Sequence, residues 1–334
     1  MSVNVPSSKE LIKAFMDRYK TAEARYRRRG VEAMRNLEAV RIKKSSDYVA
    51  RKLREAATSM PFLNDLHAFH KELLLLNISE AEYRRATSKV FNASRAVKSI
   101  RREALMMIKG AAGKGDIIKA RRRFMARMID LLNDLSKELD ELRMLGPHIR
   151  YMPSINVGLP TIVVAGMPNT GKSSFVACVS TAKPEIADYP FTTKKIIVGH
   201  VKLFGDFSVQ VLDTPGLLDR PLSERNKIEL QTILALRHLA HVIIMIIDPT
   251  PHSGNSLEEQ LRLLEEIRGA FKSPIMVVLN KVDIAADEEV RRAEAALGGA
   301  PYKVAAAKCL GTNDVIQDAI DKYVMPKLSQ GTTV

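Results

Sequence analysis

The chain has 334 residues, of which 46% are hydrophobic and 27% are charged, and this composition excludes a disordered or fibrous protein and suggests two domains. Its apolar runs fall far short of the roughly 20 residues that a membrane helix needs, and its first residues lack a secretory signal, so we expect a cytoplasmic protein. Cys178 and Cys309 have no paired spacing and no histidine cluster beside them, so we expect neither a disulfide framework nor a structural zinc site.

The formal net charge of +14 is concentrated in the first part of the chain. Residues 1–150 hold 33 Lys and Arg against 18 Asp and Glu, whereas the remaining 184 residues hold 19 against 20. This asymmetry favours a polyanionic partner for the basic half, because neutralising phosphates releases counterions; an ordinary solvated helical surface is the alternative. The basic residues form short runs that cannot all share one helix face, at 25–29, 41–44, 84–85, 101–102 and 121–123.

Residues 1 to about 147 have helical patterns almost throughout. Apolar positions in residues 117–145 recur every three or four residues, and Gly146 and Pro147 are expected to end that helix. We therefore expect an antiparallel helical bundle of four or five long helices as a first domain, residues 1–157. Further helices are expected at 11–22, 63–76 and 79–109.

From Thr161 onward, short apolar runs rich in β-branched residues alternate with helical patterns. This alternation predicts an α/β domain with a mostly parallel sheet flanked by helices, over residues 158–334. A final helix is expected at about 312–328. The runs with a strand pattern are 161–165, 196–203, 208–214, 241–248, 274–281 and 302–308.

The sequence Gly-Met-Pro-Asn-Thr-Gly-Lys-Ser matches the phosphate-binding pattern GxxxxGK(S/T), and it lies between an expected strand and an expected helix, as this motif requires. Its glycines allow the backbone to wrap around phosphates, so that N–H groups and the helix N-terminus face them. Lys172 is expected to reach the β and γ phosphates, and Ser173 to ligate Mg²⁺. The residues expected at the phosphates are Gly166, Pro168, Asn169, Thr170, Gly171, Lys172, Ser173 and Ser174.

Two further segments supply candidate Mg²⁺ ligands. Asp213 begins the sequence Asp-Thr-Pro-Gly at the tip of an expected strand. There its carboxylate can hold Mg²⁺ through water, and the Gly216 N–H can contact the γ phosphate. Alone this could be an ordinary turn, but its place one strand after the phosphate loop favours the nucleotide role. The polar segment Tyr-Pro-Phe-Thr-Thr offers a hydroxyl to Mg²⁺ in the triphosphate state; we expect Thr193, with Thr192 as the fallback and a loop cap as the alternative.

The tetrapeptide Asn-Lys-Val-Asp at 280–283 distinguishes a GTP site from an ATP site. The Asp283 carboxylate can accept hydrogen bonds from guanine N1 and the exocyclic amine, a donor pair that adenine lacks. Asn280 can bond the base edge, and the stem of Lys281 can cover the base face. Alone the tetrapeptide could end a strand, but third in this order of motifs it predicts GTP and GDP as ligands. A base-contacting loop is expected after the last strand, at Ala306, Ala307 and Lys308.

With these residues in order, the sequence resembles the Obg and HflX group of GTPases, of which the YPFTTK and NKVD segments are typical. Over the whole chain it resembles the nucleolar GTP-binding protein family, whose GTPase domain follows a basic helical domain of about this size; the stretch DTPGLLDRPLSERNKIELQ is particularly similar. That family is associated with assembly of the large ribosomal subunit. The resemblance therefore implies ribosomal RNA and a large-subunit precursor particle as partners, together with ribosomal proteins or other assembly factors.

Obg's glycine-rich N-terminal domain is absent, and no long extension follows Val334, so we expect a compact, archaeal-type, cytoplasmic and monomeric member with no membrane partner. Ala306 replaces a serine that is common in GTPases, which changes little because backbone N–H groups commonly supply that base contact. Leu217 occupies the place of a water-orienting glutamine, so intrinsic hydrolysis is expected to be slow. Related GTPases use a potassium ion held by a phosphate-loop asparagine. Asn169 has that position, which suggests K⁺-stimulated hydrolysis, although it could instead support the loop backbone. Catalytic roles are assigned to Lys172, Asn169, Thr193 and Gly216.

These features predict a GTP-hydrolysing switch that acts in large-subunit assembly and docks on ribosomal RNA through its basic helical half. The alternative is an RNA-binding scaffold with structural nucleotide and incidental hydrolysis. An aromatic content of 5% without tryptophan favours recognition of RNA backbone and shape over stacking on bases. Arg121, Arg122 and Arg123 are expected to contribute to the salt dependence of RNA binding.

Overall fold

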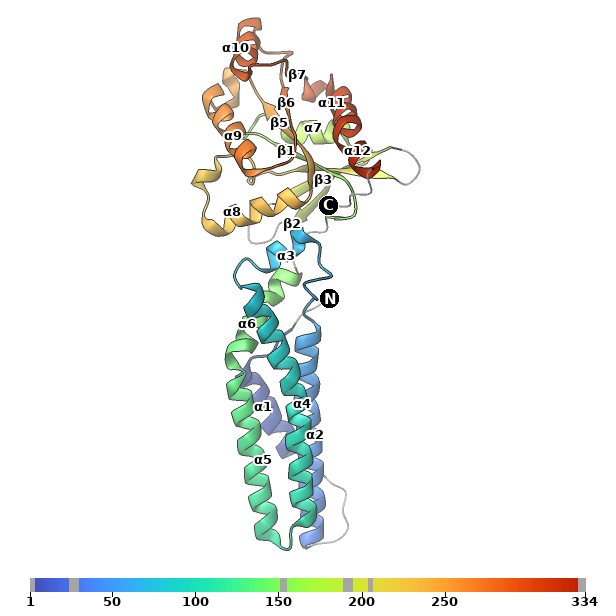
Figure 1. Ribbon diagram of the computed structural model, residues 1–334, viewed down its shortest axis with the longest axis vertical. Helices are drawn as coiled ribbons and strands as arrows, with labels where there is room; N and C mark the ends of the chain where they lie inside the picture. The colour runs from blue at the N-terminus through green and yellow to red at the C-terminus, as the bar shows by residue number, and fades with distance from the viewer. Residues whose placement is uncertain (1–3, 24–29, 151–154, 189–194, 204–206, 330–334) are drawn as a thin grey trace. The chain divides into compact units, whose positions relative to one another are not determined.

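The computed structural model describes residues 4–23, 30–150, 155–188, 195–203 and 207–329 (Figure 1). Contacts divide the chain into two compact units, one of Met1–Asp65 with Asn77–Arg150 and one of Leu66–Leu76 with Tyr151–Val334. The sequence analysis placed a single border after residue 157, so the structure differs in assigning residues 66–76 to the second unit. In the described ranges, no helix combines the length and apolarity that crossing a membrane requires.

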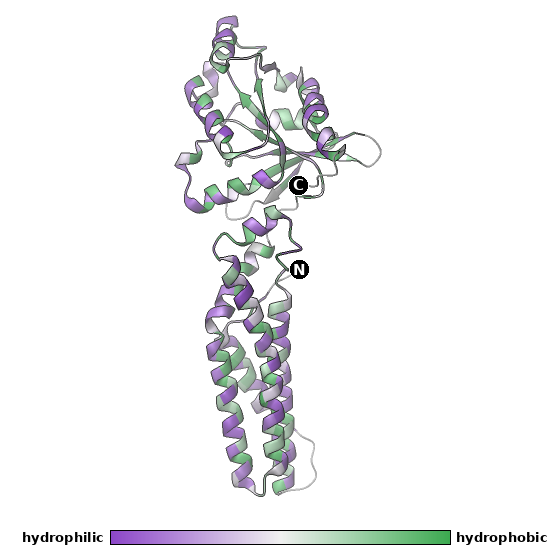
Figure 2. Ribbon diagram, viewed as in Figure 1, coloured by the Kyte–Doolittle hydropathy of each residue, from purple (hydrophilic) through white to green (hydrophobic). Residues whose placement is uncertain are grey.

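The first unit is an antiparallel helical bundle, as predicted (Figure 1). The hydroxyls of Ser7 and Ser79 cap two of its helices, each in a capping box with the glutamate three residues on. Apolar and polar positions alternate around the helices, so that each turns an apolar stripe inward (Figure 2). Its helices are α1 (Ser8–Thr21), α2 (Val31–Thr58), α4 (Glu80–Gly110), α5 (Lys114–Asp134) and α6 (Ser136–Arg150).

The helix predicted over residues 117–145 is two helices in the structure. The regular α-helix is interrupted at Leu135, between α5 and α6, although Leu135 keeps a right-handed conformation with φ −93° and ψ −1°. The predicted end at Gly146 and Pro147 is wrong, because α6 continues to Arg150 with Pro147 inside it. A proline removes one backbone hydrogen bond, and near the end of a helix the chain tolerates that loss.

The apolar stripe at 63–76 was predicted as a helix of the bundle. The structure has a shorter helix, α3 (Ala68–Leu74), and Phe69 and Leu73 are buried in the core of the second unit. Glu72 pairs with Arg237 and His238 of that unit, at 3.0 and 2.6 Å. Periodicity indicated a buried helix face here, but it carries no information about which surface covers that face.

The second unit has a seven-stranded sheet in the order β2-β3-β4-β1-β5-β6-β7. Neighbouring strands from β4 to β7 are parallel, whereas β2 and β3 pair antiparallel at one edge, which confirms the predicted mostly parallel sheet. The edge strand β2 was not predicted. The strands are β1 (Thr161–Ala165), β2 (Glu185–Asp188), β3 (Lys195–Lys202), β4 (Ser208–Asp213), β5 (Ala240–Ile247), β6 (Ile275–Leu279) and β7 (Tyr302–Lys303).

Helices cover both faces of this sheet. On one face lie α8 (Lys227–Leu234), α9 (Leu257–Ala270) and α10 (Asp287–Leu297), and on the other lie α7 (Lys172–Val179), α11 (Thr312–Ala319) and α12 (Met325–Ser329) (Figure 1). Each layer has its own apolar core. The predicted last helix is α11 and α12 joined by a π-helical turn, Ile320–Val324. Since β1, β4 and β6 run parallel, their carboxyl ends bring the predicted motifs to one edge of the sheet.

Candidate nucleotide site

The phosphate loop joins β1 to α7, and its backbone requires glycine at two positions. Gly166 has φ +145°, and a Cβ there would lie 2.4 Å from the Ile246 carbonyl oxygen. Gly171 has φ +95°, and a Cβ there would lie 2.2 Å from Asn280 Nδ2. Asn169 also adopts a left-handed conformation, with φ +64°. The loop geometry therefore depends on residues that tolerate positive φ.

The Lys172 side chain is buried inside this loop. Its Nζ donates to the carbonyl oxygens of Gly166 and Met167, both at 2.8 Å. Burial lowers the pKa of Lys172, and the nearby Asp213 carboxylate opposes that shift. No side chain caps the first turn of α7, so its N–H groups lack a capping side chain among the described residues and are available to an anion.

The other predicted phosphate-loop residues divide into buried and exposed positions. Thr170 is buried and its hydroxyl donates to the Met167 carbonyl at 2.9 Å, which stabilises the turn. Pro168, Asn169 and Ser174 are exposed. The Asn169 side chain makes no hydrogen bond to the part of the chain that the structure describes, so its carboxamide is accessible to a ligand.

Asp213 and Ser173 form a pair of oxygen donors beside the loop. The Ser173 hydroxyl donates to Asp213 Oδ2 at 2.5 Å. Burial raises the pKa of Asp213, and the hydrogen bond from Ser173 acts against that rise. The second oxygen, Oδ1, is buried without a hydrogen-bond partner in the described chain. A hydroxyl and a carboxylate with an unsatisfied buried oxygen suit a hard divalent cation, so this pair fits Mg²⁺. The predicted ligands Thr192 and Thr193 lie outside the described residues.

The segment after Asp213 has a network that the sequence analysis missed. The Gly216 N–H, expected at the γ phosphate, donates to Asp219 Oδ2 at 2.6 Å. The guanidinium of Arg225 donates to the carbonyls of Gly216 and Leu217, both at 2.7 Å, and to Asp219 Oδ1 at 3.0 Å. The Arg225 side chain is only 2% exposed, so this ion pair is shielded from water. Asp219 and Arg225 lie in the stretch DTPGLLDRPLSERNKIELQ, whose sequence between these two residues has no periodicity that could reveal their pairing.

Leu217, at the place of a water-orienting glutamine, is 1% exposed and belongs to the core of the second unit. Its side chain therefore packs inward and has no polar atom to orient water.

Asn280 links the phosphate loop to the base-side loop. Its Nδ2 donates to the Thr170 carbonyl at 2.8 Å, and its Oδ1 accepts from the Ala306 N–H at 2.9 Å. Asn280 is 2% exposed. The predicted contact of its amide with the base edge stays a prediction, and in this structure both ends of the amide contact the protein. Asn280 therefore acts as a brace that holds the two loops together.

The two charged residues of the tetrapeptide each have a partner. Lys281, with φ +60°, extends its Nζ to within 2.5 Å of Asp248 Oδ2. Lys308 Nζ lies 2.7 Å from Asp283 Oδ2, and this hydrogen bond lowers the pKa of Asp283. The lowered pKa keeps the Asp283 carboxylate ionised, and its side chain is 18% exposed, so the carboxylate is accessible to a base. Ala307, next to Lys308, is also exposed.

A disulfide joins Cys178 of α7 to Cys309, so the expectation of no disulfide is wrong. The two residues are 131 positions apart, and spacing alone could not reveal that the fold brings their Cα atoms to 5.4 Å. Cys309 directly follows the turn Ala306–Lys308, so the bond ties the helix of the phosphate loop to the base-side loop. Asn280 and the disulfide thus connect the same two regions.

The comparisons with known proteins identify the family of the chain. A model of the NOG1 N-terminal helical domain matches residues 3–156, and a model of nucleolar GTP-binding protein 1 matches residues 227–283. The chain belongs to the nucleolar GTP-binding protein 1 family. This confirms the resemblance to that family, whose name describes GTP-binding proteins.

An uncharacterised protein of Methanocaldococcus jannaschii is 35% identical over 257 residues, which is 77% of this chain and 72% of that protein. Nucleolar GTP-binding protein 1 of Caenorhabditis elegans is 32% identical over 296 residues, which is 88% of this chain but 43% of the relative. The chain thus spans less than half the length of that relative. A crystal structure described as nucleolar GTP-binding protein 1 of Plasmodium falciparum is 30% identical with a TM-score of 0.46, over 54% of this chain and 93% of that one.

Proposed function

We propose that this protein is a GTP-hydrolysing switch that acts in assembly of the large ribosomal subunit and docks on ribosomal RNA through its helical unit. The observation that carries the proposal is the convergence of Lys172, the Ser173–Asp213 pair and Asp283 at one edge of the sheet. The helical unit supplies the excess of positive charge.

Each group at the site has a role in this proposal. Lys172 and the N–H groups of the phosphate loop hold the β and γ phosphates, displacing the carbonyl contacts that Lys172 makes in the structure. Ser173 and Asp213 would hold Mg²⁺, with Thr193 or Thr192 added in the triphosphate state, and the ion would offset the negative charge of the phosphates. The Asp283 carboxylate accepts from guanine N1–H and the exocyclic amine.

Hydrolysis is slow in this proposal. Leu217 packs into the core, so no side chain at that position orients the attacking water. The accessible carboxamide of Asn169 would hold a potassium ion, whose charge would stabilise the developing negative charge on the phosphates.

The switch depends on the Gly216 N–H, which the structure places on Asp219. In the triphosphate state this N–H would turn to the γ phosphate, and the segment held by Arg225 would have to rearrange. Loss of the γ phosphate would restore the Asp219 contact, so a partner that binds this segment would sense the nucleotide.

The ribosomal partner comes from the family and from charge. The relatives are named nucleolar GTP-binding proteins, and the basic unit of this chain suits an RNA polyanion. We include ribosomal proteins or other assembly factors as further partners, and a cytoplasmic location for the monomeric protein.

The test of the enzyme assignment is GTP turnover by the full chain and by Lys172→Ala. The wild-type protein should release phosphate from GTP and not from ATP, and the variant should lose turnover while keeping its circular-dichroism spectrum and melting temperature. The second candidate function, an RNA-binding scaffold with structural nucleotide, is favoured by the burial of Leu217. It predicts instead that Lys172→Ala loses stability, because the nucleotide that supports the fold is lost.

A further inference from the structure

Three neighbouring hollows on the helical unit form one continuous surface, here called the α2–α4 surface. One hollow lies between α1 and α2, a second lies between α2 and α4, and a third lies along α4. Asp47 and Arg51 line both the first and the second, and Lys98 lines both the second and the third, so the hollows are continuous. All of these residues belong to the same compact unit.

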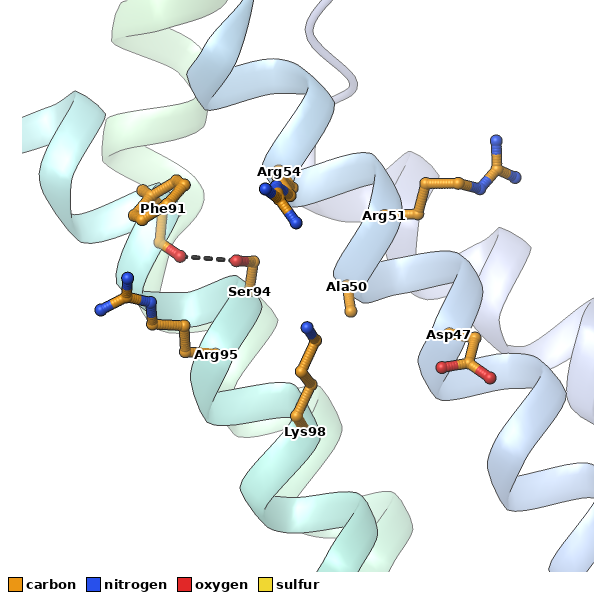
Figure 3. A pocket seen from close by; sticks show the side chains of 8 residues that line it. All are labelled: Asp47, Ala50, Arg51, Arg54, Phe91, Ser94, Arg95 and Lys98. Atoms are coloured by element: carbon orange, nitrogen blue, oxygen red, sulfur yellow. Dashed lines mark hydrogen bonds between the residues drawn. The ribbon is translucent and has the colours of Figure 1, made fainter.

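The α2–α4 surface is strongly basic. Nine lysine and arginine side chains line it, against the single acidic side chain of Asp47, which pairs with Arg101. Arg54, Lys98 and Arg102 have no acidic partner among the residues that the structure describes. In the central hollow, Lys98 extends from α4 into the space beside α2, and Arg54 lies at the α2 side of the same space (Figure 3). The positive charge of the α2–α4 surface is therefore available to an external anion.

The arginine run on α5, which the sequence analysis favoured, is different. Arg121 lies 3.9 Å from the buried carboxylate of Glu38, and Arg123 lies 2.9 Å from Glu103. Arg127 also pairs with Glu103. Carboxylates of the bundle itself thus offset part of the charge on α5. A variant that removes three arginines from α5 is therefore a matched control for one that removes three charges from the α2–α4 surface.

The chemistry of the α2–α4 surface favours phosphate over bases. Its aromatic rings already have guanidinium partners, with Arg18 4.0 Å from the centre of the Tyr48 ring and Arg95 5.1 Å from that of Phe91. These rings offer no free platform for stacking unpaired bases. Guanidinium groups match phosphate oxygens in bidentate geometry, which makes an arginine-rich surface suited to a nucleic-acid backbone.

An anionic membrane is less compatible with this surface. Met106 is the one large apolar side chain that is exposed among the described residues lining it, and membrane insertion needs a broader apolar face. We propose that the α2–α4 surface binds the sugar–phosphate backbone of double-helical RNA. This inference rests on the proposed RNA docking and specifies where on the helical unit that docking occurs.

The test compares two triple variants of the full chain. Arg54→Ala/Lys98→Ala/Arg102→Ala removes three charges from the α2–α4 surface, and Arg121→Ala/Arg122→Ala/Arg123→Ala removes three from α5. Fluorescence anisotropy measures binding of each to a blunt RNA duplex over a series of KCl concentrations. Each phosphate contact contributes about 0.7–0.9 to the slope of log K against log salt, so the first variant should lower the slope by about 2 to 3. The second should lower it by less than about 1, because only Arg122 of its three residues has no acidic partner among the described residues.

The outcomes separate this inference from the proposal on which it rests. If the wild-type chain fails to bind the duplex at low salt, the proposed RNA docking fails and the surface assignment fails with it. If the wild type binds but the α5 variant lowers the slope and the α2–α4 variant does not, only the surface assignment is overturned. Tighter binding to phosphatidylserine vesicles than to RNA would overturn it in favour of a membrane.

Folding of both variants is checked by their helical circular dichroism and melting temperatures. If the triple variant on the α2–α4 surface does not fold, Lys98→Glu replaces it. This single change reverses one exposed charge and should weaken RNA binding more than Lys98→Ala does, whereas equal binding by the two would contradict the assignment.

Discussion

Asp283→Asn should change the nucleotide preference of this protein from guanine to xanthine. The Asp283 carboxylate is 18% exposed, and Lys308 keeps it ionised, so it is positioned to accept two hydrogen bonds from the guanine edge. An asparagine keeps one acceptor and turns an N–H donor toward the exocyclic amine of guanine. Xanthine has a carbonyl at that position, which accepts from the new donor.

The magnitude follows from the hydrogen bonds that are lost. Bonds to a charged group contribute about 1.5–3 kcal/mol each, so losing one bond and weakening the other costs about 3–4 kcal/mol, or a factor of about 10² to 10³ in the Kd for GDP. The change also removes the anionic partner of Lys308, but the Lys308 side chain is 60% exposed, and an ion pair open to solvent contributes little to folding. The melting temperature of the variant should therefore stay close to that of the wild type.

The assay is competitive displacement of a fluorescent guanine nucleotide from the wild type, and of a fluorescent xanthine nucleotide from the variant. The variant should bind XDP more tightly than GDP, in reverse of the wild type. Unchanged GDP affinity in a folded variant would refute the assignment of Asp283 to the base. Equal losses for GDP and XDP would show that the residue supports the loop without reading the base.

Three further predictions follow from other contacts at the site. Reducing the bond between Cys178 and Cys309, or replacing both by serine, should lower the free energy of unfolding by about 2–5 kcal/mol, because the bond closes a loop of 131 residues; identical melting curves with and without reductant would contradict this. Asp219→Asn should shift the ratio of GTP-analogue to GDP affinity about fivefold toward the analogue. A neutral amide accepts the Gly216 N–H about 1 kcal/mol less strongly than the carboxylate does, so it competes less well with the γ phosphate for that N–H. Isothermal titration with both nucleotides measures the ratio. GTP hydrolysis should be faster in KCl than in NaCl at matched ionic strength, and Asn169→Ala should remove that difference; equal wild-type rates in the two salts would exclude a potassium role.

The parts of the site that could be predicted from sequence are those set by local chemistry. The phosphate loop has positive φ at residues 166, 169 and 171, and at two of these the motif supplies glycine, where a Cβ would also clash. Asp213 ends β4 and Asp283 lies in the tetrapeptide that follows β6, and parallel strands bring their carboxyl ends to one edge. In these cases the backbone context that gives the residue its role lies within a few positions of it.

The parts that could not be predicted depend on contacts between distant segments. The disulfide joins residues 131 positions apart, and no spacing rule could pair them. The bridge that the Asn280 amide forms between Thr170 and Ala306 could not be predicted, because the relative positions of those residues are set only by the packing of the sheet. The helix α3 was predicted from its apolar stripe, but only the tertiary structure shows that the stripe packs in the second unit.

The ion pair of Asp219 with Arg225 is another such case. The two partners are six positions apart, and the segment between them has no regular secondary structure except one short 3-10 turn, Leu222–Glu224. Neither helical nor strand periodicity could therefore indicate the pair. The buried guanidinium fixes the conformation of the segment through two backbone carbonyls. The conformation of this segment was therefore accessible only from the structure.

The most direct test of the central claim is co-sedimentation of the full chain with large ribosomal subunits and their precursor particles, in GDP and in a non-hydrolysable GTP analogue. A switch must bind its target with different affinities in its two states, because a ligand with equal affinity for both conformations shifts nothing. We predict that a larger fraction of the protein pellets with the particles in the analogue than in GDP. Equal pelleting in the two nucleotides would contradict a GTP-dependent switch, and no pelleting with either particle would contradict a role on the large subunit.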